Sequence, residues 1–354
     1  MSLVSPFLKR VVYPGLSMTG RMHRRRRMPV VVTYHGIQPE RYKSIDAALD
    51  GGLVTASQFT AQLSLLKRKY HVISPQEFRL WYQNKLELPR ASVLLTCDDG
   101  LQNVLTAMLP ILEDAGFPCL FFITGKSLQP NQSMLWYEQL YLMLLASNLS
   151  ETFVEETTTS LTAKPKSKRE LWSDLVRNLS RHDADERDRR MRLLAGRLGL
   201  REDWCGRYEQ DTALRNRFFM LDQAGAQQLS RAVNVTLGAH TLSHPVLSQS
   251  SDDVAWNEIR ECRRTMEQTL DREIWTFAYP FGDVASVTDR ERSLAERAGF
   301  ECAFLNLEGE LSKQTPRFAL PRVHVTAEMD LAEFEAHVSG FYFALRRMAG
   351  RSQR

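Results

Sequence analysis

The chain has 354 residues, of which 46 are basic (Lys and Arg) and 42 are acidic, giving a formal net charge of +4. Charges of both signs alternate along it, and no aromatic residues interleave with a basic patch, so no nucleic-acid partner is expected. Five cysteines, an odd number without paired spacing, indicate a reducing compartment and argue against a disulfide framework or a cysteine zinc site. This length can bury a core as one barrel with an insertion or as two domains.

The N-terminal arm combines apolar residues with a run of arginines. Lys9 and Pro14 interrupt the apolar residues before they could span a bilayer, and no secretory signal is visible. We therefore expect a cytoplasmic protein. The basic segment Arg24–Arg27 follows a short amphipathic stretch, which would suit peripheral attachment to anionic lipid at the inner membrane face. A solvated arm is the alternative.

Short β-branched, apolar segments alternate with helical patterns along most of the chain. Strands are expected at 29–34, 71–74, 92–97, 119–124, 234–239, 274–279, 302–306 and 319–325. Helices are expected between most of them, at 56–69, 75–85, 103–115, 251–270, 287–298 and 330–347. This alternation predicts an α/β fold with a parallel sheet and crossover helices. Because no Gly-x-Gly-x-x-Gly or P-loop motif occurs, we favour a barrel over an open nucleotide-binding sheet.

Residues 127–233 do not fit this alternation. The crossover is far longer than one helix requires, and it is rich in helical patterns, at Trp136–Leu145, Lys168–Leu179 and Asp185–Leu198. We expect a helical insertion on the catalytic side, where it could roof the pocket; a packed spacer or an oligomer contact is the alternative. The expected divisions are an arm at 1–28, barrel parts at 29–126 and 234–347, the insertion at 127–233 and a polar tail at 348–354.

Two motifs at predicted strand ends carry the chemistry. The run ASVLLTCDDG contains Asp98 and Asp99, and the run NVTLGAHTLSHP contains His240 and His244. Because the strands of a parallel α/β barrel end on one face, these side chains should meet there. Asp99 and the two histidines match the three ligands of a catalytic zinc-type site, which leaves Asp98 as general base. Pro245 biases His244 away from helical backbone, so we expect both histidines on a loop.

A third motif follows the strand expected at 274–279. The triplet Pro280-Phe281-Gly282 turns sharply out of this strand and leaves backbone N–H groups free to face a ligand. An N–H group aimed at a developing oxyanion stabilises a tetrahedral intermediate. Phe281 is the expected donor, although such a triplet is also a common structural turn.

These three segments, in this order, resemble the motifs of the NodB-like polysaccharide deacetylases, carbohydrate esterase family four. The family has a Thr-Phe-Asp-Asp-Gly motif and a His-Ser/Thr-x-x-His-Ser/Pro motif. The resemblance implies that Asp98 is the base and that the ligands of a divalent metal, most often zinc, are Asp99, His240 and His244. The family's last motif carries a histidine that acts as general acid, and His324 is similar to it, with a hydrogen-bonded structural role as the alternative.

The resemblance covers roughly residues 29–124 and 234–326. It implies a distorted (β/α) barrel of about seven strands, in place of the eight of a regular barrel. Two segments are similar to the exopolysaccharide branch of the family, Val-Val-Thr-Tyr-His-Gly-Ile at 31–37 and Phe-Ala-Tyr-Pro-Phe-Gly at 277–282.

One family position is not matched. The third motif of the family carries an arginine that orients the catalytic aspartate, and this chain has Ala278 there. In the strand expected at 319–325, Arg322 and His324 share one face and apolar residues share the other. We therefore predict that Arg322 supplies the missing guanidinium to Asp98 from a neighbouring strand. A salt bridge deep in the barrel is the alternative.

The predicted activity is metal-dependent N-deacetylation, the hydrolysis of a carbon–nitrogen (amide) bond. Its substrate would be an N-acetylated amino sugar in a polysaccharide, an oligosaccharide or a lipid-linked glycan, with the sugar and the oligomeric state left open. O-deacetylation, or hydrolysis of a non-sugar amide, is the alternative chemistry. Because of Ala278, a glycan-binding relative without activity is a second alternative. A partner-docking protein that uses the insertion is a third.

Overall fold

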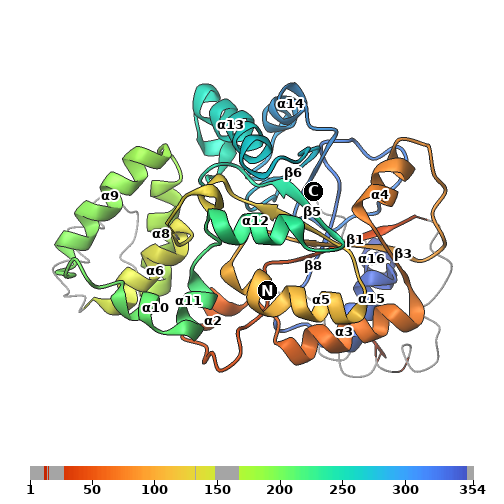
Figure 1. Cartoon of the computed structure of the whole chain (residues 1–354), viewed down its shortest axis with the longest axis horizontal. Coiled ribbons are helices and arrows are strands. Elements are labelled where there is room, and N and C mark those ends of the chain that lie inside the picture. Colours follow the sequence, from red (N-terminus) through yellow and green to blue (C-terminus); the bar gives the residue numbers. More distant parts are fainter. Residues whose placement is uncertain (1–11, 14, 16–27, 132, 148–166, 349–354) are drawn as a thin grey trace.

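The computed structural model describes residues 12, 13, 15, 28–131, 133–147 and 167–348. Parallel strands form its centre, helices surround them, and further helices extend to one side (Figure 1). The strands are β1 (Val30–Tyr34), β2 (His71–Ile73), β3 (Ser92–Cys97), β4 (Cys119–Ile123), β5 (Val235–Ala239), β6 (Thr276–Ala278), β7 (Cys302–Phe304) and β8 (Val323–His324). All eight coincide with strands expected from the sequence.

The strands form one row in the order β7-β6-β5-β4-β3-β1-β8, and every pairing is parallel. A parallel bridge between Phe304 and Leu320, with a 2.9 Å hydrogen bond from the Leu305 N–H to the Leu320 carbonyl, links β7 to the segment entering β8. Backbone hydrogen bonds therefore connect the two ends of the row. β2 lies off this row and pairs with the start of β3. The predicted distorted (β/α) barrel is confirmed.

Inward-facing residues of the barrel change from apolar to polar along the strands. Those nearer the strand starts belong to one buried apolar cluster that includes Val31, Leu94, Leu120 and Leu320. Because side chains alternate between faces, the same face of β1, β3 and β8 continues toward the carboxyl ends into polar residues. These are Thr33 and His35, then Thr96 and Asp98, then Arg322 and His324. The chemistry-bearing side chains thus gather at one end of the barrel.

The outward faces of the strands pack against helices in a second, larger core. Three of these helices begin with a capping box, in which the side chain of a Ser or Thr and that of a Glu or Gln satisfy free backbone N–H groups. The helices of the barrel are α3 (Ala56–Lys69), α4 (Pro75–Tyr82), α5 (Leu109–Ala115), α12 (Gln223–Arg231), α13 (Asp252–Leu270), α14 (Asp289–Arg297) and α15 (Leu331–Val338). Short helices are α2 (Ala47–Asp50), the π-helix η3 (Val104–Met108), and the 3-10 helices η4 (Gly125–Leu128) and η5 (Leu247–Gln249).

The prediction of one continuous helix at 330–347 was wrong, because two helices occupy this range. α15 ends near Val338, and α16 (Phe341–Met348) follows it. Between them Gly340 has a φ of 77°, a left-handed conformation that ends a helix and that glycine adopts without a steric penalty. Tyr13 of the N-terminal arm is buried here, with its ring centroid 6.3 Å from that of Phe341.

Helices of residues 127–233 extend to the left of the barrel in Figure 1. They are α6 (Trp136–Ala146), α8 (Lys168–Leu179), α9 (Ala184–Arg197), α10 (Gly206–Gln210) and α11 (Thr212–Phe218). They form two apolar clusters, one of which also includes Leu49 of α2. α12, later in the same range, contacts β5 and α13 as a crossover helix of the barrel would. Within the described residues, no helix is both long enough and apolar enough to cross a membrane.

Candidate metal centre

The turn after β3 brings two adjacent carboxylates to one site. Asp98 continues the strand, with its N–H donating to the Tyr34 carbonyl at 2.9 Å, so its side chain points inward. Asp99 and Gly100 then adopt φ values of 75° and 74°. This left-handed turn is costly for a residue with a side chain, and it redirects the Asp99 carboxylate toward the same end of the barrel. Gly100 lacks room for a side chain, since an added Cβ would lie 2.9 Å from Ile123 Cγ2.

The two histidines lie on a loop that leaves β5, as predicted. The His240 N–H donates to the Ile123 carbonyl at 3.0 Å, which continues the pairing of β5 with β4. Thr241 and His244 have φ values of 64° and 57°, and the His244 N–H donates to Thr241 Oγ1 at 3.1 Å. These contacts bend the loop so that both imidazoles face Asp99.

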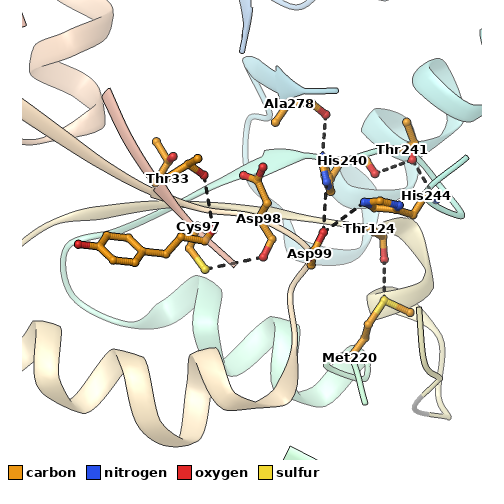
Figure 2. Close-up of polar contacts among 12 residues, drawn as sticks. Thr33, Cys97, Asp98, Asp99, Thr124, Met220, His240, Thr241, His244 and Ala278 are labelled. Atoms are coloured by element: carbon orange, nitrogen blue, oxygen red, sulfur yellow. Dashed lines mark hydrogen bonds and ion pairs between the residues drawn. The ribbon is translucent and has the colours of Figure 1, made fainter. Parts of the chain in front are cut away.

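Figure 2 shows the Asp99 carboxylate directed at both histidine rings. Its Oδ1 lies 3.4 Å from His240 Nε2 and 3.2 Å from His244 Nε2, and the three side chains are buried. One ligand atom from each residue falls within 4.8 Å of the other two. The predicted ligand set is therefore brought together by segments about 140 residues apart in the chain.

The surroundings of these three residues fit a divalent metal. The Ala278 carbonyl can only accept, so His240 Nδ1–H donates to it at 2.7 Å, and Nε2 is the ring nitrogen that faces Asp99. Asp99 Oδ1 has no hydrogen-bond donor in the described part of the chain, although it is buried. Burial alone would raise the pKa of Asp99, but its contacts with His240 and His244 lower it well below the usual range. Two imidazole nitrogens and one carboxylate match the three protein ligands of a catalytic zinc site.

Asp98 pairs with Arg322, the residue predicted to supply its guanidinium. Arg322 Nη1 donates to Asp98 Oδ1 at 2.7 Å and Nη2 donates to Oδ2 at 2.6 Å, in a buried bidentate pair. Arg322 Nε donates to the Leu305 carbonyl at 2.9 Å, which fixes the plane of the fork. Burial by itself would raise the pKa of Asp98, but the charge and hydrogen bonds of Arg322, together with the nearby His240 and His35, lower that pKa below its usual value. Asp98 is thus an ionised, oriented carboxylate.

His324 lies beside His35, with their ring centroids 4.7 Å apart. His324 Nε2 and His35 Nδ1 are both buried and lack a hydrogen-bond partner among the residues that the structure describes. Burial, together with the charges of His35 and Arg322, lowers the pKa of His324 to about 3, so its imidazole is neutral at neutral pH. A neutral imidazole cannot donate a proton as a general acid. His324 can therefore play its predicted role only if it first accepts a proton during turnover.

The turn at Pro280-Phe281-Gly282 lies against the loop that carries His240 and His244. Phe281 and Gly282 have φ values of 61° and 65°, and within the described ranges the Phe281 N–H has no acceptor. An added Cβ on Gly282 would lie 2.4 Å from the Asn306 nitrogen, so only glycine fits. The Phe281 ring centroid is 5.1 Å from that of His244. The predicted donor is therefore next to a predicted metal ligand.

Three side chains of the insertion reach this site and were not predicted. The Tyr137 ring centroid lies 5.4 Å from that of His244 and 5.7 Å from that of Phe281. Trp136 and Arg187 bond to the loop that carries the histidines. The expected position of the insertion on the catalytic side indicated the neighbourhood, but no motif in it singles out these residues.

The family model for polysaccharide deacetylases matches residues 209–303. This stretch holds both histidines predicted to bind the metal and the Pro-Phe-Gly turn. Over this stretch the chain is similar to the polysaccharide deacetylase family. The predicted resemblance to polysaccharide deacetylases is confirmed over this stretch, and with it the predicted class of enzyme, a hydrolase. A comparison with curated protein sequences gave no significant match.

Solved structures of deacetylases share the fold. The Streptococcus pyogenes deacetylase PplD in complex with acetate has 16% identity and a TM-score of 0.54, over 87% of this chain and 97% of PplD. A de-N-acetylase from Aggregatibacter actinomycetemcomitans has 13% identity and a TM-score of 0.54, over 87% of this chain and 99% of that one. IcaB from Ammonifex degensii has 16% identity and a TM-score of 0.54, over 88% and 97%. At these identities the likeness concerns the fold.

Proposed function

We propose that this deacetylase-family chain is a metal-dependent N-deacetylase of an N-acetylated amino sugar in a polysaccharide, an oligosaccharide or a lipid-linked glycan. The main support is that Asp99, His240 and His244 lie at the same end of the barrel as the Asp98–Arg322 pair. The first set suits a divalent ion, for which we propose zinc, and the second supplies an ionised base. N-deacetylation is also the activity named for one of the structures with this fold.

The residues divide the reaction between them. A bound divalent ion would polarise the acetyl carbonyl and lower the pKa of a water molecule toward neutrality. Asp98 would take a proton from the attacking water, while Arg322 keeps the carboxylate ionised and oriented. The Phe281 N–H would donate to the oxyanion of the tetrahedral intermediate. The carbon–nitrogen bond then breaks, acetate leaves, and the amine accepts a proton, for which His324 is the proposed donor once it has been protonated in turnover.

Acetate release from N-acetylated glycans tests this function. The purified full chain should release acetate, lose this activity when a chelator removes its metal, and regain it on addition of zinc. Metal analysis of the chain as purified gives the ion it carries. Glycan binding without acetate release would instead indicate a relative that has lost activity. Release only from O-acetylated substrates would assign O-deacetylation.

We further propose that the enzyme works in the cytoplasm and attaches peripherally to the inner membrane face through its basic arm. The arginines concerned, Arg24–Arg27, lie outside the described residues. Each would contribute about 1 kcal/mol near an anionic surface. The chain should therefore bind anionic vesicles in a salt-sensitive way, and replacement of Arg24–Arg27 with glutamine should abolish binding while activity on a soluble fragment is retained. Vesicle binding that ignores salt, or no binding, would contradict this attachment.

A further inference from the structure

The loop 240–245, here called the metal loop, depends on outside contacts for its conformation. It carries both histidines, has no regular secondary structure, and contains two non-glycine residues with positive φ, Thr241 and His244. Such a backbone persists only where its surroundings hold it in place. The spacing of the two imidazoles is therefore set by whatever binds the loop's polar groups.

The barrel supplies one set of these contacts. The N–H groups of Gly125 and Lys126, at the start of η4, donate to the carbonyls of Thr241 and Leu242 at 2.9 and 3.0 Å. Glu258 of α13 accepts from the Ser243 N–H at 2.9 Å and from Ser243 Oγ at 2.6 Å. These contacts fix the middle of the loop against η4 and α13. They do not involve the carbonyls of Ser243 and His244.

Two helices of the insertion supply partners for these two carbonyls. Trp136 at the start of α6 donates its indole N–H to the His244 carbonyl at 2.9 Å. Arg187 of α9 donates through Nη2 to the Ser243 carbonyl at 3.2 Å and to Ser243 Oγ at 2.9 Å. The two side chains also pack on each other, with the Arg187 guanidinium carbon 4.8 Å from the centre of the Trp136 ring.

A buried arginine at position 187 is expected to lower the stability of the fold. Its side chain is fully buried, and its Nε and Nη1 have no acceptor among the residues described. A buried cation with unpaired donors costs stability, and an apolar side chain of similar volume would often pack at least as well. The guanidinium at this position donates to both the Ser243 carbonyl and the Ser243 hydroxyl while it packs against the Trp136 ring. A spacer or an oligomer contact would need no such donor.

We propose that Trp136 and Arg187 are positioning residues and that the insertion, through α6 and α9, holds the metal loop in its ligating conformation. This inference rests on the proposed metal-dependent function and deepens it. The insertion then contributes to the metal centre. Loss of these contacts would lower the affinity for metal.

Substitutions that remove only the donors test this inference in the full chain. Trp136→Phe keeps an aromatic ring without the N–H, and Arg187→Met keeps much of the volume without the guanidinium. Loss of a partner that orients a metal ligand typically weakens metal binding about 10- to 100-fold. Both variants should therefore bind zinc about 10- to 100-fold more weakly in competition with a chromophoric chelator, with native circular dichroism and a lower kcat that saturating zinc restores in part.

A matched control removes a similar donor that does not reach the loop. Arg263 donates to the Ala298 carbonyl at 2.8 Å while packing 5.4 Å from the Phe300 ring. Arg263→Met should bind zinc within about twofold of the natural chain, a smaller change than the one expected for the test pair.

Each outcome decides the matter. Native zinc affinity in both folded test variants, or equal weakening in the control, would overturn the positioning role while the proposed function stands. If the natural chain binds no zinc, the proposed function fails, and this inference with it. Should Arg187→Met not fold, Arg187→Lys retains the charge and a single donor, and zinc affinity in that variant and in Trp136→Phe decides.

Discussion

Replacement of Asp98 by asparagine is expected to leave the metal in place and to lower turnover about a hundredfold or more. Asparagine has the same shape and can still accept from Arg322, but it cannot take a proton from the attacking water. The three proposed ligands are untouched by this change, because Asp98 pairs with Arg322 and only Asp99 lies against His240 and His244. Metal content after dialysis and the rate of acetate release are the two measurements.

The ligand variants should behave in the opposite way. Asp99→Ala, His240→Ala and His244→Ala should each lose most of the bound metal, and with it activity, because a three-residue site has no spare ligand. Asp114→Asn, a carboxylate lost at the exposed end of α5, serves as control and should change neither quantity. If Asp98→Asn loses the metal while Asp99→Asn retains it, then Asp98 is the ligand and Asp99 is the base, the reverse of the proposed roles.

The parts of the site that follow strands could be predicted from the sequence. Strand periodicity fixes which side chains share a face, and the parallel arrangement fixes where strands end, so Asp98, Arg322 and His324 could be placed at one end of the barrel. The backbone turn at Asp99 was implied by the glycine that follows it. The same reasoning placed His240 and His244 on a loop, through the proline after the second histidine.

The contacts of the insertion could not be predicted in this way. Trp136 lies on a mostly buried helix and Arg187 on a charged one. The rotation of these helices about their axes, and their packing against the barrel, are set by tertiary contacts and leave no local pattern. A tryptophan at the start of a helix and an arginine on a charged one resemble ordinary core and surface residues. The break at Gly340, in contrast, could have been predicted from a glycine within an otherwise helical pattern, but the helix expected at 330–347 runs across it.

Removal of the Arg322 guanidinium should lower turnover without removing the metal. Arg322→Lys keeps one positive charge, but an ammonium group cannot bond to both oxygens of Asp98 and to the Leu305 carbonyl in one plane. We therefore expect a lower kcat with native metal content and native circular dichroism. Arg322→Met goes further and leaves Asp98 buried without its partner, which should reduce the free energy of unfolding by about 3–5 kcal/mol.

The pH dependence of activity separates this role from a purely structural one. The ionised form of Asp98 is the active base, so the rate falls as the pH drops through the pKa of Asp98. In the natural chain burial raises that pKa, and Arg322, with smaller contributions from His240 and His35, more than offsets the rise, which keeps the pKa below the usual value. Without the guanidinium, burial dominates and the pKa rises, so the acidic limb of the kcat/KM profile should move to higher pH in Arg322→Met and by less in Arg322→Lys. An Arg322→Lys enzyme with the natural rate and an unshifted profile would show that the guanidinium supports the barrel and leaves the base untouched.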